Sequence, residues 1–297
     1  MKITATLGVV IFLIGILTPR QPKSRRPQVF LNHFYVVLDS ATYKDIEQSP
    51  FLRREFAVTE QRTTVRTDRT YTGLYFYGTN TYFEFFDVSS DTSTQVGFSG
   101  IALGVDRVGE LQAASSEISS SFAVKQETIT RQYNGKQVPW FYMGEQKDFP
   151  LGSRLAVWFM EYHPRFLEEW NSQPGTHNQG ITRKQILQRY GAVLKDIPAK
   201  PYLEDVVALT LATDDVNRKK LAELCKLLGY SEQIVGDAQV LKGPDIELRL
   251  LPQTEESRGI REITMRVRRK PAEQDEFRFG AKSVLKFQGN GLATWSF

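Results

Sequence analysis

The chain has 297 residues, of which 38 are Lys or Arg and 34 are Asp or Glu, so its formal net charge is +4. A hydrophobic fraction of 41% and a charged fraction of 24% exclude a disordered or collagen-like chain. The single cysteine, Cys225, excludes a disulfide framework and a cysteine-rich zinc site. Because the net charge is small, we expect no nucleic-acid partner.

The N-terminal segment, residues 1–27, differs from the rest of the chain. Residues 3–17 form an apolar run, and a basic cluster follows at residues 20–26. A run of this length lies between the core of a signal peptide and a minimal membrane span. Positive charge after the run favours an uncleaved membrane anchor, with a cleaved signal peptide as the alternative. We therefore predict a membrane-anchored or exported protein, tethered through residues 3–17.

Residues 28–163 contain one structural unit twice, which predicts a first domain of paired modules. Alternation, helical spacing and turn residues predict a strand, a helix and three further strands in each copy. The first copy is predicted at residues 30–39, 40–56, 61–67, 71–77 and 81–88. The second copy is predicted at residues 98–106, 107–118, 122–131, 138–144 and 154–163.

Residues 164–200 break this pattern and are predicted to form a helical linker that ends near two prolines. A third copy follows, with a strand at 205–214, an amphipathic helix at 216–228 and strands at 235–241 and 246–251. A fourth, shortened copy without a convincing helix completes a degenerate second domain over residues 201–297.

Each unit would leave one side of its sheet apolar, so the units are expected to pair and bury that side. The sequence thus predicts an α+β fold in which tandem βαβββ modules form two cup-like, curved mixed sheets with helices outside. The small residues at positions 100, 102 and 104 share a strand face, and we expect them to leave room for a ligand over the sheet.

The repeated unit, the opening LNHFYVVLDSATYK and the closing WFMEYHP resemble the vicinal oxygen chelate superfamily. That superfamily includes glyoxalase I, extradiol dioxygenases and bleomycin-resistance proteins. The resemblance covers most of residues 30–297 at the level of pattern. Within the superfamily, the chain is similar to an uncharacterised bacterial branch. It implies metal ligands on the first and last strands of paired units, pointing into a shared cup.

Carried over by position, the resemblance implies His33, Glu84 and Glu161 as metal ligands, with Gly100 in place of a fourth. It implies Zn, Ni, Mn or Fe as the divalent ion, and Glu84 and Glu161 as the acid–base residues of catalysis. The alternative for both carboxylates is an ion pair inside the sheet, with an arginine such as Arg62, Arg66 or Arg154 as the partner.

Three functions follow from these expectations. The first is a metal-dependent lyase or isomerase that acts on a small oxygenated substrate. The second, favoured by Gly100, is a metal-free protein that binds a small molecule in the same cup. The third is a tethered scaffold whose cup is filled by its own side chains. The sequence leaves open the oligomeric state and the choice among the three functions.

Overall fold

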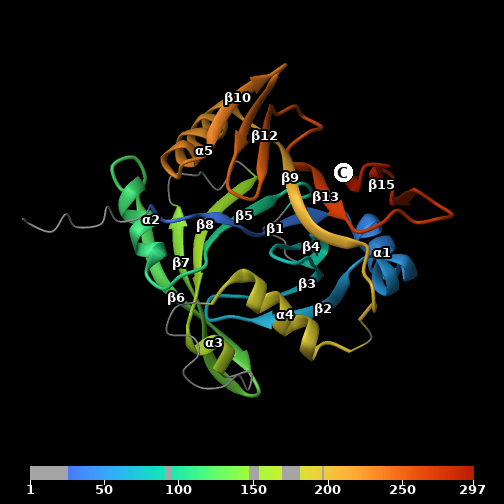
Figure 1. The fold of residues 1–297 in the computed structure, drawn as a ribbon, viewed down its shortest axis with the longest axis horizontal. Helices are drawn as coiled ribbons and strands as arrows, with labels where there is room; N and C mark the ends of the chain where they lie inside the picture. The colour runs from blue at the N-terminus through green and yellow to red at the C-terminus, as the bar shows by residue number, and fades with distance from the viewer. Residues whose placement is uncertain (1–25, 91–94, 147–153, 169–180, 196) are drawn as a thin grey trace, which may run out of the picture.

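The computed structural model describes residues 26–90, 95–146, 154–168, 181–195 and 197–297. Its strands form two eight-stranded mixed sheets (Figure 1), which confirms the predicted α+β class with curved sheets. The strand order is β2-β3-β4-β1-β5-β8-β7-β6 in the first sheet and β10-β11-β12-β9-β13-β16-β15-β14 in the second.

The first sheet contains two units, each with a helix between its first and second strands. The first unit comprises β1 (Phe30–Leu38), α1 (Ser40–Gln48), β2 (Val58–Val65), β3 (Thr70–Tyr77) and β4 (Tyr82–Asp87), with a π-helical turn at Leu52–Phe56 and a 3-10 turn at Val88–Ser90. The second unit comprises β5 (Ser99–Val105), α2 (Glu110–Ile118), β6 (Val124–Tyr133), β7 (Lys136–Gln146) and β8 (Leu155–Tyr162). The units join where β1 runs antiparallel to β5.

The second sheet repeats this arrangement, but its second unit has no helix among the described residues. Its elements are β9 (Leu203–Thr213), α5 (Asp215–Leu227), β10 (Ser231–Val235), β11 (Ala238–Lys242), β12 (Glu247–Pro252), β13 (Gly259–Val267), β14 (Glu276–Phe279), β15 (Ser283–Phe287) and β16 (Leu292–Ser296). Two helices, α3 (Arg165–Glu168) and α4 (Arg183–Val193), lie between the sheets in sequence.

An aspartate at the end of the first strand starts the helix in two of the units. Asp39 accepts a hydrogen bond from the backbone N–H of Thr42, and Asp214 accepts one from Asn217, each at 2.9 Å. These bonds satisfy amide groups that a helix leaves unpaired in its first turn. Asp39 is therefore the N-cap of α1.

The first sheet curls until its two edge strands meet. Arg66, just after β2, bridges Arg131 on β6, and the hydroxyls of Thr67 and Thr130 lie 2.7 Å apart. The edges of the second sheet, β10 and β14, have no such bridge among the described residues. The first sheet therefore encloses an interior, whereas the second stays open.

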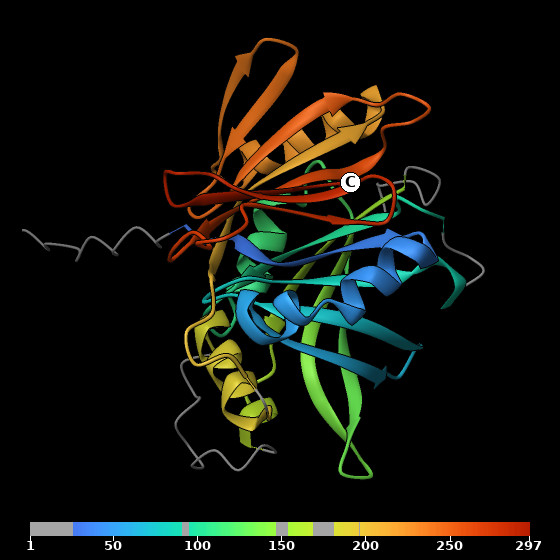
Figure 2. The same ribbon diagram turned by 90° about the vertical axis from the view of Figure 1, so that its right-hand side faces the viewer.

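The second sheet lies over the first (Figure 2), and the two share one hydrophobic core. Trp295 of β16 packs 5.1 Å from Phe85 of β4, measured between ring centroids, and Phe51 stacks on Phe277 at 4.0 Å. The carboxylate of Asp205 on β9 accepts from the backbone N–H groups of Asn80 and Thr81, each at 3.0 Å. The sheets fall within residues 28–163 and 201–297, and the division into two domains with a linker stays a prediction.

The predicted location needs a correction. Within the part of the chain that the structure describes, no helix has both the length and the apolar character that a bilayer crossing requires. This finding contradicts a membrane-anchored or exported protein. The apolar run at residues 3–17, on which the prediction rested, lies outside the described residues.

Candidate functional site

Two of the three predicted site residues meet inside the curled first sheet. His33 on β1 and Glu84 on β4 are buried, with 7% and 5% of their surface exposed. Nε2 of His33 lies 3.7 Å from Oε1 of Glu84, a separation too long for a hydrogen bond. Nδ1 of His33 lies 2.9 Å from Oδ1 of Asn32, and the imidazole stacks on Tyr82 at 4.5 Å between centroids.

Burial sets the charge of this pair. It lowers the pKa of His33 to about 3, helped by the positive charge of Arg66. Burial also raises the pKa of Glu84 to about 7, although Arg62 and hydrogen bonds from Tyr75 and Tyr82 act against it. Both shifts follow from the cost of keeping a charge out of water. The imidazole is therefore neutral near pH 7, and the contact is not an ion pair.

The third predicted residue, Glu161, does not reach this interior. It lies on β8, and its carboxylate accepts hydrogen bonds from the backbone N–H groups of Gly109 at 2.9 Å and Leu111 at 3.0 Å. These amides start α2, which packs on the outer face of the sheet. Side chains on β8 alternate between faces, so Glu161 points outward with Phe159 while Met160 and Tyr162 point inward. The structure thus separates Glu161 from His33 and Glu84.

Strand register explains this difference from the expected triad. His33 pairs with Tyr82 in the first unit, and the equivalent Gly100 pairs with Ala156 in the second. The residue two positions further on is Glu84 in the first unit and Trp158 in the second. The structure therefore aligns Glu84 with Trp158. The comparison of the two closing sequences had aligned Glu84 with Glu161, three residues further along.

The room that small residues were expected to leave over β5 is occupied. A side chain placed on Gly100 would have its Cβ 2.2 Å from the ring of Tyr35 and 2.8 Å from that of Trp158. A Cβ on Gly104 would lie 2.8 Å from that of Asn32. The glycines therefore admit neighbouring side chains to the sheet surface, and these side chains fill the expected ligand space.

The donors in the interior do not fit a divalent metal ion. Catalytic sites of this kind use about three protein ligands, and the interior supplies one imidazole and one carboxylate. Across the described ranges, no group of three or more His, Cys, Asp or Glu side chains is arranged to hold a metal ion. We therefore derive no chemistry through a metal.

Helix α4 lies over the open side of the interior. Ile186, Leu187 and Tyr190 of this helix join the interior cluster of aromatic side chains. The ring of Tyr190 stacks on Tyr77 of β3 at 4.9 Å between centroids. A segment that the sequence assigned to a linker therefore closes most of the predicted cup.

A cavity of about 200 Å³ remains at the mouth of the curled sheet, beside α4. We call it the mouth cavity; its lining residues are Glu60, Arg62, Thr63, Thr64, Arg131, Gln132, Tyr133, Tyr190 and Val193. Among these residues, the sequence pointed only to Arg62, as a possible partner for a carboxylate, and not to Arg131, Tyr133 or Tyr190. The sequence pattern that could have indicated this site is the placement of charged residues at alternate positions of β2 and β6, which puts them on one face of each strand.

The two arginines of the mouth cavity lie against aromatic rings. Arg62 pairs with Glu60 at 2.5 Å, and its guanidinium lies 4.2 Å from the centroid of Tyr75. Burial acts to lower the pKa of Arg62, but Glu60 and the surrounding phenol groups outweigh it and hold that pKa well above its usual value. Arg131 is buried; it donates to the hydroxyl of Tyr190 at 3.1 Å and lies 5.1 Å from Trp140.

These features define a protein of paired βαβββ modules with one enclosed aromatic interior and a cationic cavity at its mouth. The chain belongs to a family of unknown function, because the model described as "Family of unknown function (DUF5829)" matches residues 31–297. No curated protein matches the sequence.

Solved structures match the fold at low sequence identity. A hypothetical protein from Staphylococcus aureus has a TM-score of 0.52 and 11% identity, and the match covers 89% of this chain and 97% of that one. This similarity shows the fold alone.

Two dioxygenases match with TM-scores below 0.5, which are too low to support a conclusion about this chain. One is 2,2',3-trihydroxybiphenyl 1,2-dioxygenase from Sphingomonas wittichii strain RW1, with a TM-score of 0.41, 10% identity and coverage of 91% of this chain and 89% of that one. The other is a xylose isomerase-like TIM barrel/4-hydroxyphenylpyruvate dioxygenase fusion protein, with a TM-score of 0.42, 10% identity and coverage of 83% and 38%. The paired-module topology is the one that the resemblance to the vicinal oxygen chelate superfamily implies, and membership of that superfamily stays a prediction.

Proposed function

We propose that this protein binds a small planar organic acid at the mouth cavity without a metal ion. The observation that carries the proposal is a cavity of about 200 Å³ that Arg62, Arg131 and Tyr190 line together. The proposal keeps the glyoxalase-like fold and the small-molecule ligand that the sequence predicted. It moves the site from the buried His33–Glu84 pair to the rim of the same interior.

The size of the cavity suits a ligand of one ring. An apolar cavity of about 150 Å³ is enough to hold benzene in a protein interior, and the mouth cavity is about 200 Å³. A substituted six-membered ring is therefore near the upper limit of what the cavity accepts without movement of α4.

The chemistry of the walls selects a planar anion. Arg62 and Arg131 give two positive charges against the one negative charge of Glu60, so the walls carry a net charge of +1. Guanidinium groups bind carboxylates through paired, charge-assisted hydrogen bonds. The ring of Tyr133, which is half-buried, offers a face for an aromatic ligand. An aryl carboxylate has both the negative charge and the aromatic ring that these walls would bind.

A thermal-shift and calorimetric titration tests this proposal on the full chain. The probes are benzoate, phenylacetate and salicylate, with neutral benzamide as the matched control, each in the presence and absence of EDTA. We expect the carboxylates to raise the melting temperature saturably, benzamide to raise it less, and EDTA to change neither result. A stronger effect of benzamide, or loss of binding in EDTA, would contradict the proposal.

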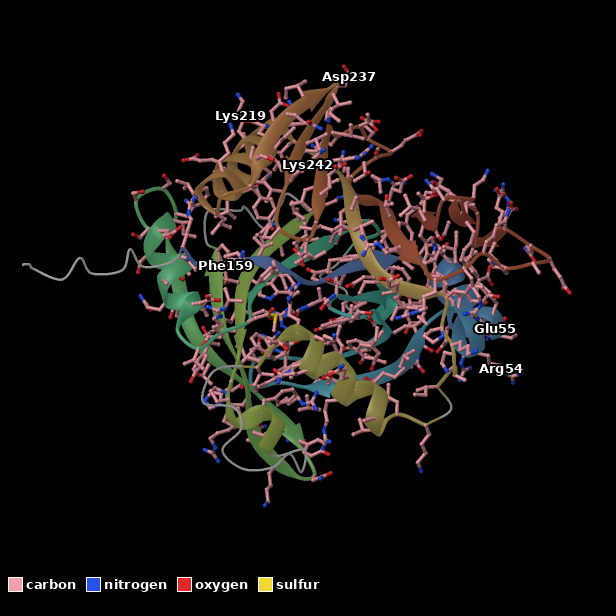
Figure 3. The ribbon with its side chains drawn as sticks, viewed as in Figure 1. Arg54, Glu55, Phe159, Lys219, Asp237 and Lys242 are labelled. Atoms are coloured by element: carbon pink, nitrogen blue, oxygen red, sulfur yellow. The ribbon has the colours of Figure 1, made fainter. Side chains whose placement is uncertain are left out.

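Variants locate the site. Arg131→Gln removes a wall charge and should weaken carboxylate binding by about tenfold or more, because a hydrogen bond between charged groups contributes about 1.5–3 kcal/mol. Arg131→Lys keeps the charge and should bind with intermediate affinity, which separates loss of the site from loss of folding. Arg54→Gln changes the charge equally at an exposed position outside the cavity (Figure 3) and should bind like the wild type.

A scaffold without a ligand site is the second candidate, because the interior is filled by its own side chains. Tyr75, Tyr82 and Met160 are among the residues that pack there, each at most 5% exposed. This candidate predicts that the carboxylates leave the melting temperature unchanged in the titration above. The metal-dependent lyase or isomerase lacks this kind of support, because among the described residues no three donor side chains are arranged to hold a metal ion.

A further inference from the structure

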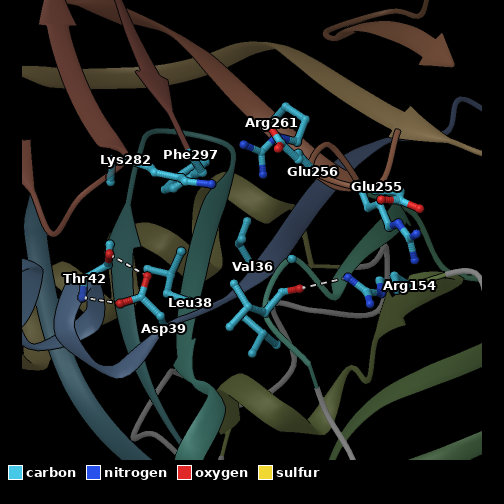
Figure 4. Close-up of a pocket in the computed structure, with 15 residues that line it drawn as sticks. Val36, Leu38, Asp39, Thr42, Arg154, Glu255, Glu256, Arg261, Lys282 and Phe297 are labelled. Atoms are coloured by element: carbon cyan, nitrogen blue, oxygen red, sulfur yellow. Dashed lines mark hydrogen bonds between the residues drawn. The ribbon is translucent and has the colours of Figure 1, made fainter. Parts of the chain in front are cut away.

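A second cavity lies where the two sheets meet, away from the mouth cavity. It measures about 120 Å³, and we call it the junction cavity. Its walls come from β1 and the residue just before β8 in the first sheet, and from residues 255–261 and the turn before β15 in the second (Figure 4). Of its four cations, the sequence drew attention only to Arg154, as a possible partner for a carboxylate inside the sheet.

Four cationic side chains line the junction cavity: Arg154, Arg258, Arg261 and Lys282. Arg154 comes from the first sheet and the other three from the second, so the tertiary fold alone brings them together. In Figure 4 the side chains of Arg261 and Lys282 reach into the same hollow near Val36, and Arg154 approaches it from the opposite side. Such a concentration of like charge is unfavourable unless anions offset it.

None of these four cations forms an ion pair with a carboxylate of the described residues. Arg154 donates to Oε1 of Gln95 at 2.6 Å, and Arg258 donates to the carbonyl of Thr254 at 3.2 Å, so neither of these bonds involves a carboxylate. The side chains of Arg261 and Lys282 make no hydrogen bond or ion pair with any residue that the structure describes. Burial lowers the pKa of Arg261, because the guanidinium is partly desolvated and no opposite charge compensates.

Three carboxylates also line the cavity, and they do not pair with these cations. Asp39 accepts from the N–H and the hydroxyl of Thr42 and so caps α1. Glu255 and Glu256 are exposed and lie beyond ion-pair distance of the four cations. The lining side chains comprise four cations and three carboxylates, and none of the carboxylates forms an ion pair with any of the cations.

The backbone holds the two sides of the cavity at a fixed separation. Gly259 has φ +70°, and a Cβ there would lie 2.1 Å from the carbonyl oxygen of Gly97, so only glycine permits this approach. The backbone N–H of Ile260 donates to the hydroxyl of Ser99 at 3.0 Å. Because these contacts join β5 to β13, Arg154 and Arg261 are presented from a preorganised frame.

We propose that the junction cavity binds a small tetrahedral oxyanion, either phosphate or the phosphate group of a small phosphomonoester. The cavity measures about 120 Å³, several times what a single water molecule requires, which leaves room for an anion of this size. Arginine and lysine are the side chains that bind phosphate, through forked and single charge-assisted hydrogen bonds respectively. The bound anion would contact cations from both sheets and so stabilise their junction.

The test is a titration of the full chain at low ionic strength with inorganic phosphate and, in a separate arm, with glycerol phosphate. Calorimetry measures the affinity, and thermal melting measures the gain in stability. We expect one saturable site, a melting temperature that rises with phosphate, and an affinity that falls as salt is added. Tighter binding of glycerol phosphate would identify a phosphomonoester as the natural ligand, and tighter binding of phosphate would identify the free ion.

Paired variants make the test specific. Arg261→Gln should weaken phosphate binding by about tenfold or more, and Lys282→Gln by severalfold, because each removes a charged donor. Arg54→Gln and Lys219→Gln make the same changes at exposed positions outside the cavity (Figure 3) and should leave the affinity unchanged. Arg261→Lys keeps the charge and should bind better than Arg261→Gln, which separates a binding role from a folding role.

Absence of saturable binding to the wild-type chain at millimolar phosphate would overturn the proposal. Equal affinities of wild type and Arg261→Gln would also overturn it, because the anion would then lie elsewhere. The mouth cavity is independent of this outcome, since it shares no lining residue with the junction cavity.

Discussion

Nε2 of His33 faces Oε1 of Glu84 across 3.7 Å, and both side chains are almost completely shielded from solvent. Burial moves their pKa values toward the neutral forms, down to about 3 for His33 and up to about 7 for Glu84. The pair is therefore two neutral polar groups at slightly acidic pH and carries a negative charge at alkaline pH. This charge state has measurable consequences for stability.

Replacement of Glu84 by glutamine should change how stability depends on pH. The folded-state pKa of about 7 lies above the ordinary value of 4.5, so the protonated form is favoured on folding. This contribution is complete below pH 4.5 and is lost as pH rises to about 7. Wild type should therefore lose up to about 3 kcal/mol relative to Glu84→Gln between pH 4.5 and 8. Urea unfolding at a series of pH values measures this difference.

Glu273, which is exposed in a loop, provides the matched control for this series. Glu273→Gln should keep a nearly constant stability difference from the wild type over the same pH range. A constant difference for Glu84→Gln as well would mean that Glu84 is ionised throughout, and it would contradict the raised pKa. His33 contributes in the opposite sense, since its lowered pKa gives stability above pH 6.5 that is lost as pH falls toward 3.

The imidazole of His33 should stay neutral through the physiological range. Its pKa of about 3 predicts that its C–H resonances lack the large shift of ring protonation between pH 5 and 8 and show only a smaller shift as Glu84, 3.7 Å away, ionises near pH 7. NMR spectra of the chain, which has three histidines, can be assigned by comparison with His33→Gln. A His33 resonance that titrates with the full amplitude of imidazole protonation in this pH range, and still does so in Glu84→Gln, would contradict the neutral assignment.

Glu161 should matter for stability and not for ligand binding. Its carboxylate accepts the N–H groups of Gly109 and Leu111 at the start of α2. Glu161→Ala leaves these amides without their partner and should cost about 1–2 kcal/mol, as the loss of a helix cap does. Urea unfolding measures the cost, with Gln112→Ala on the exposed side of the same helix as control. Unchanged stability with altered binding of the carboxylate probes would reverse this assignment.

Arg183 should stabilise the junction between the sheets. Its guanidinium pairs with Asp245 at 2.5 Å and Asp106 at 3.4 Å, and it donates to the carbonyl of Leu31 at 2.7 Å. Arg183→Ala leaves the carboxylates of Asp106 and Asp245, both largely shielded from solvent, without their cationic partner. The substitution should lower the free energy of unfolding by about 3 kcal/mol. Chemical unfolding measures the cost, and Lys184→Ala, an exposed neighbour, should cost less than about 0.5 kcal/mol.

The position of α4 illustrates what local pattern does not contain. The helical spacing of residues 183–194 predicts the helix correctly, because spacing is a property of one segment. Its place over the mouth of the first sheet depends on Arg183, which reaches Asp106 and Asp245, residues 77 and 62 positions away. Contacts at such separations leave no periodic trace in a single sequence, so the segment was assigned to a linker.

Glu161 illustrates a second limit. Alternation along β8 correctly grouped Glu161 with Phe159 on one face, but alternation does not say which face turns inward. That choice is set by the pairing of Gly100 with Ala156, which brings Trp158 to the position of Glu84. A shift of an odd number of residues moves every side chain of a strand to the other face, and the three-residue offset between the two closing sequences had this effect.

The sequence by itself determined the repeated units and most of their strands and helices. These features depend on periodicity and capping, which are properties of neighbouring residues. The sequence did not separate β10 from β11, for which it predicted one strand over residues 235–241. Tertiary structure alone decided that Glu161 caps a helix, that aromatic side chains and α4 fill the cup, and that four cations meet between the sheets. Each of these depends on register or on the packing of segments far apart in the chain, and a linear pattern carries no information about either.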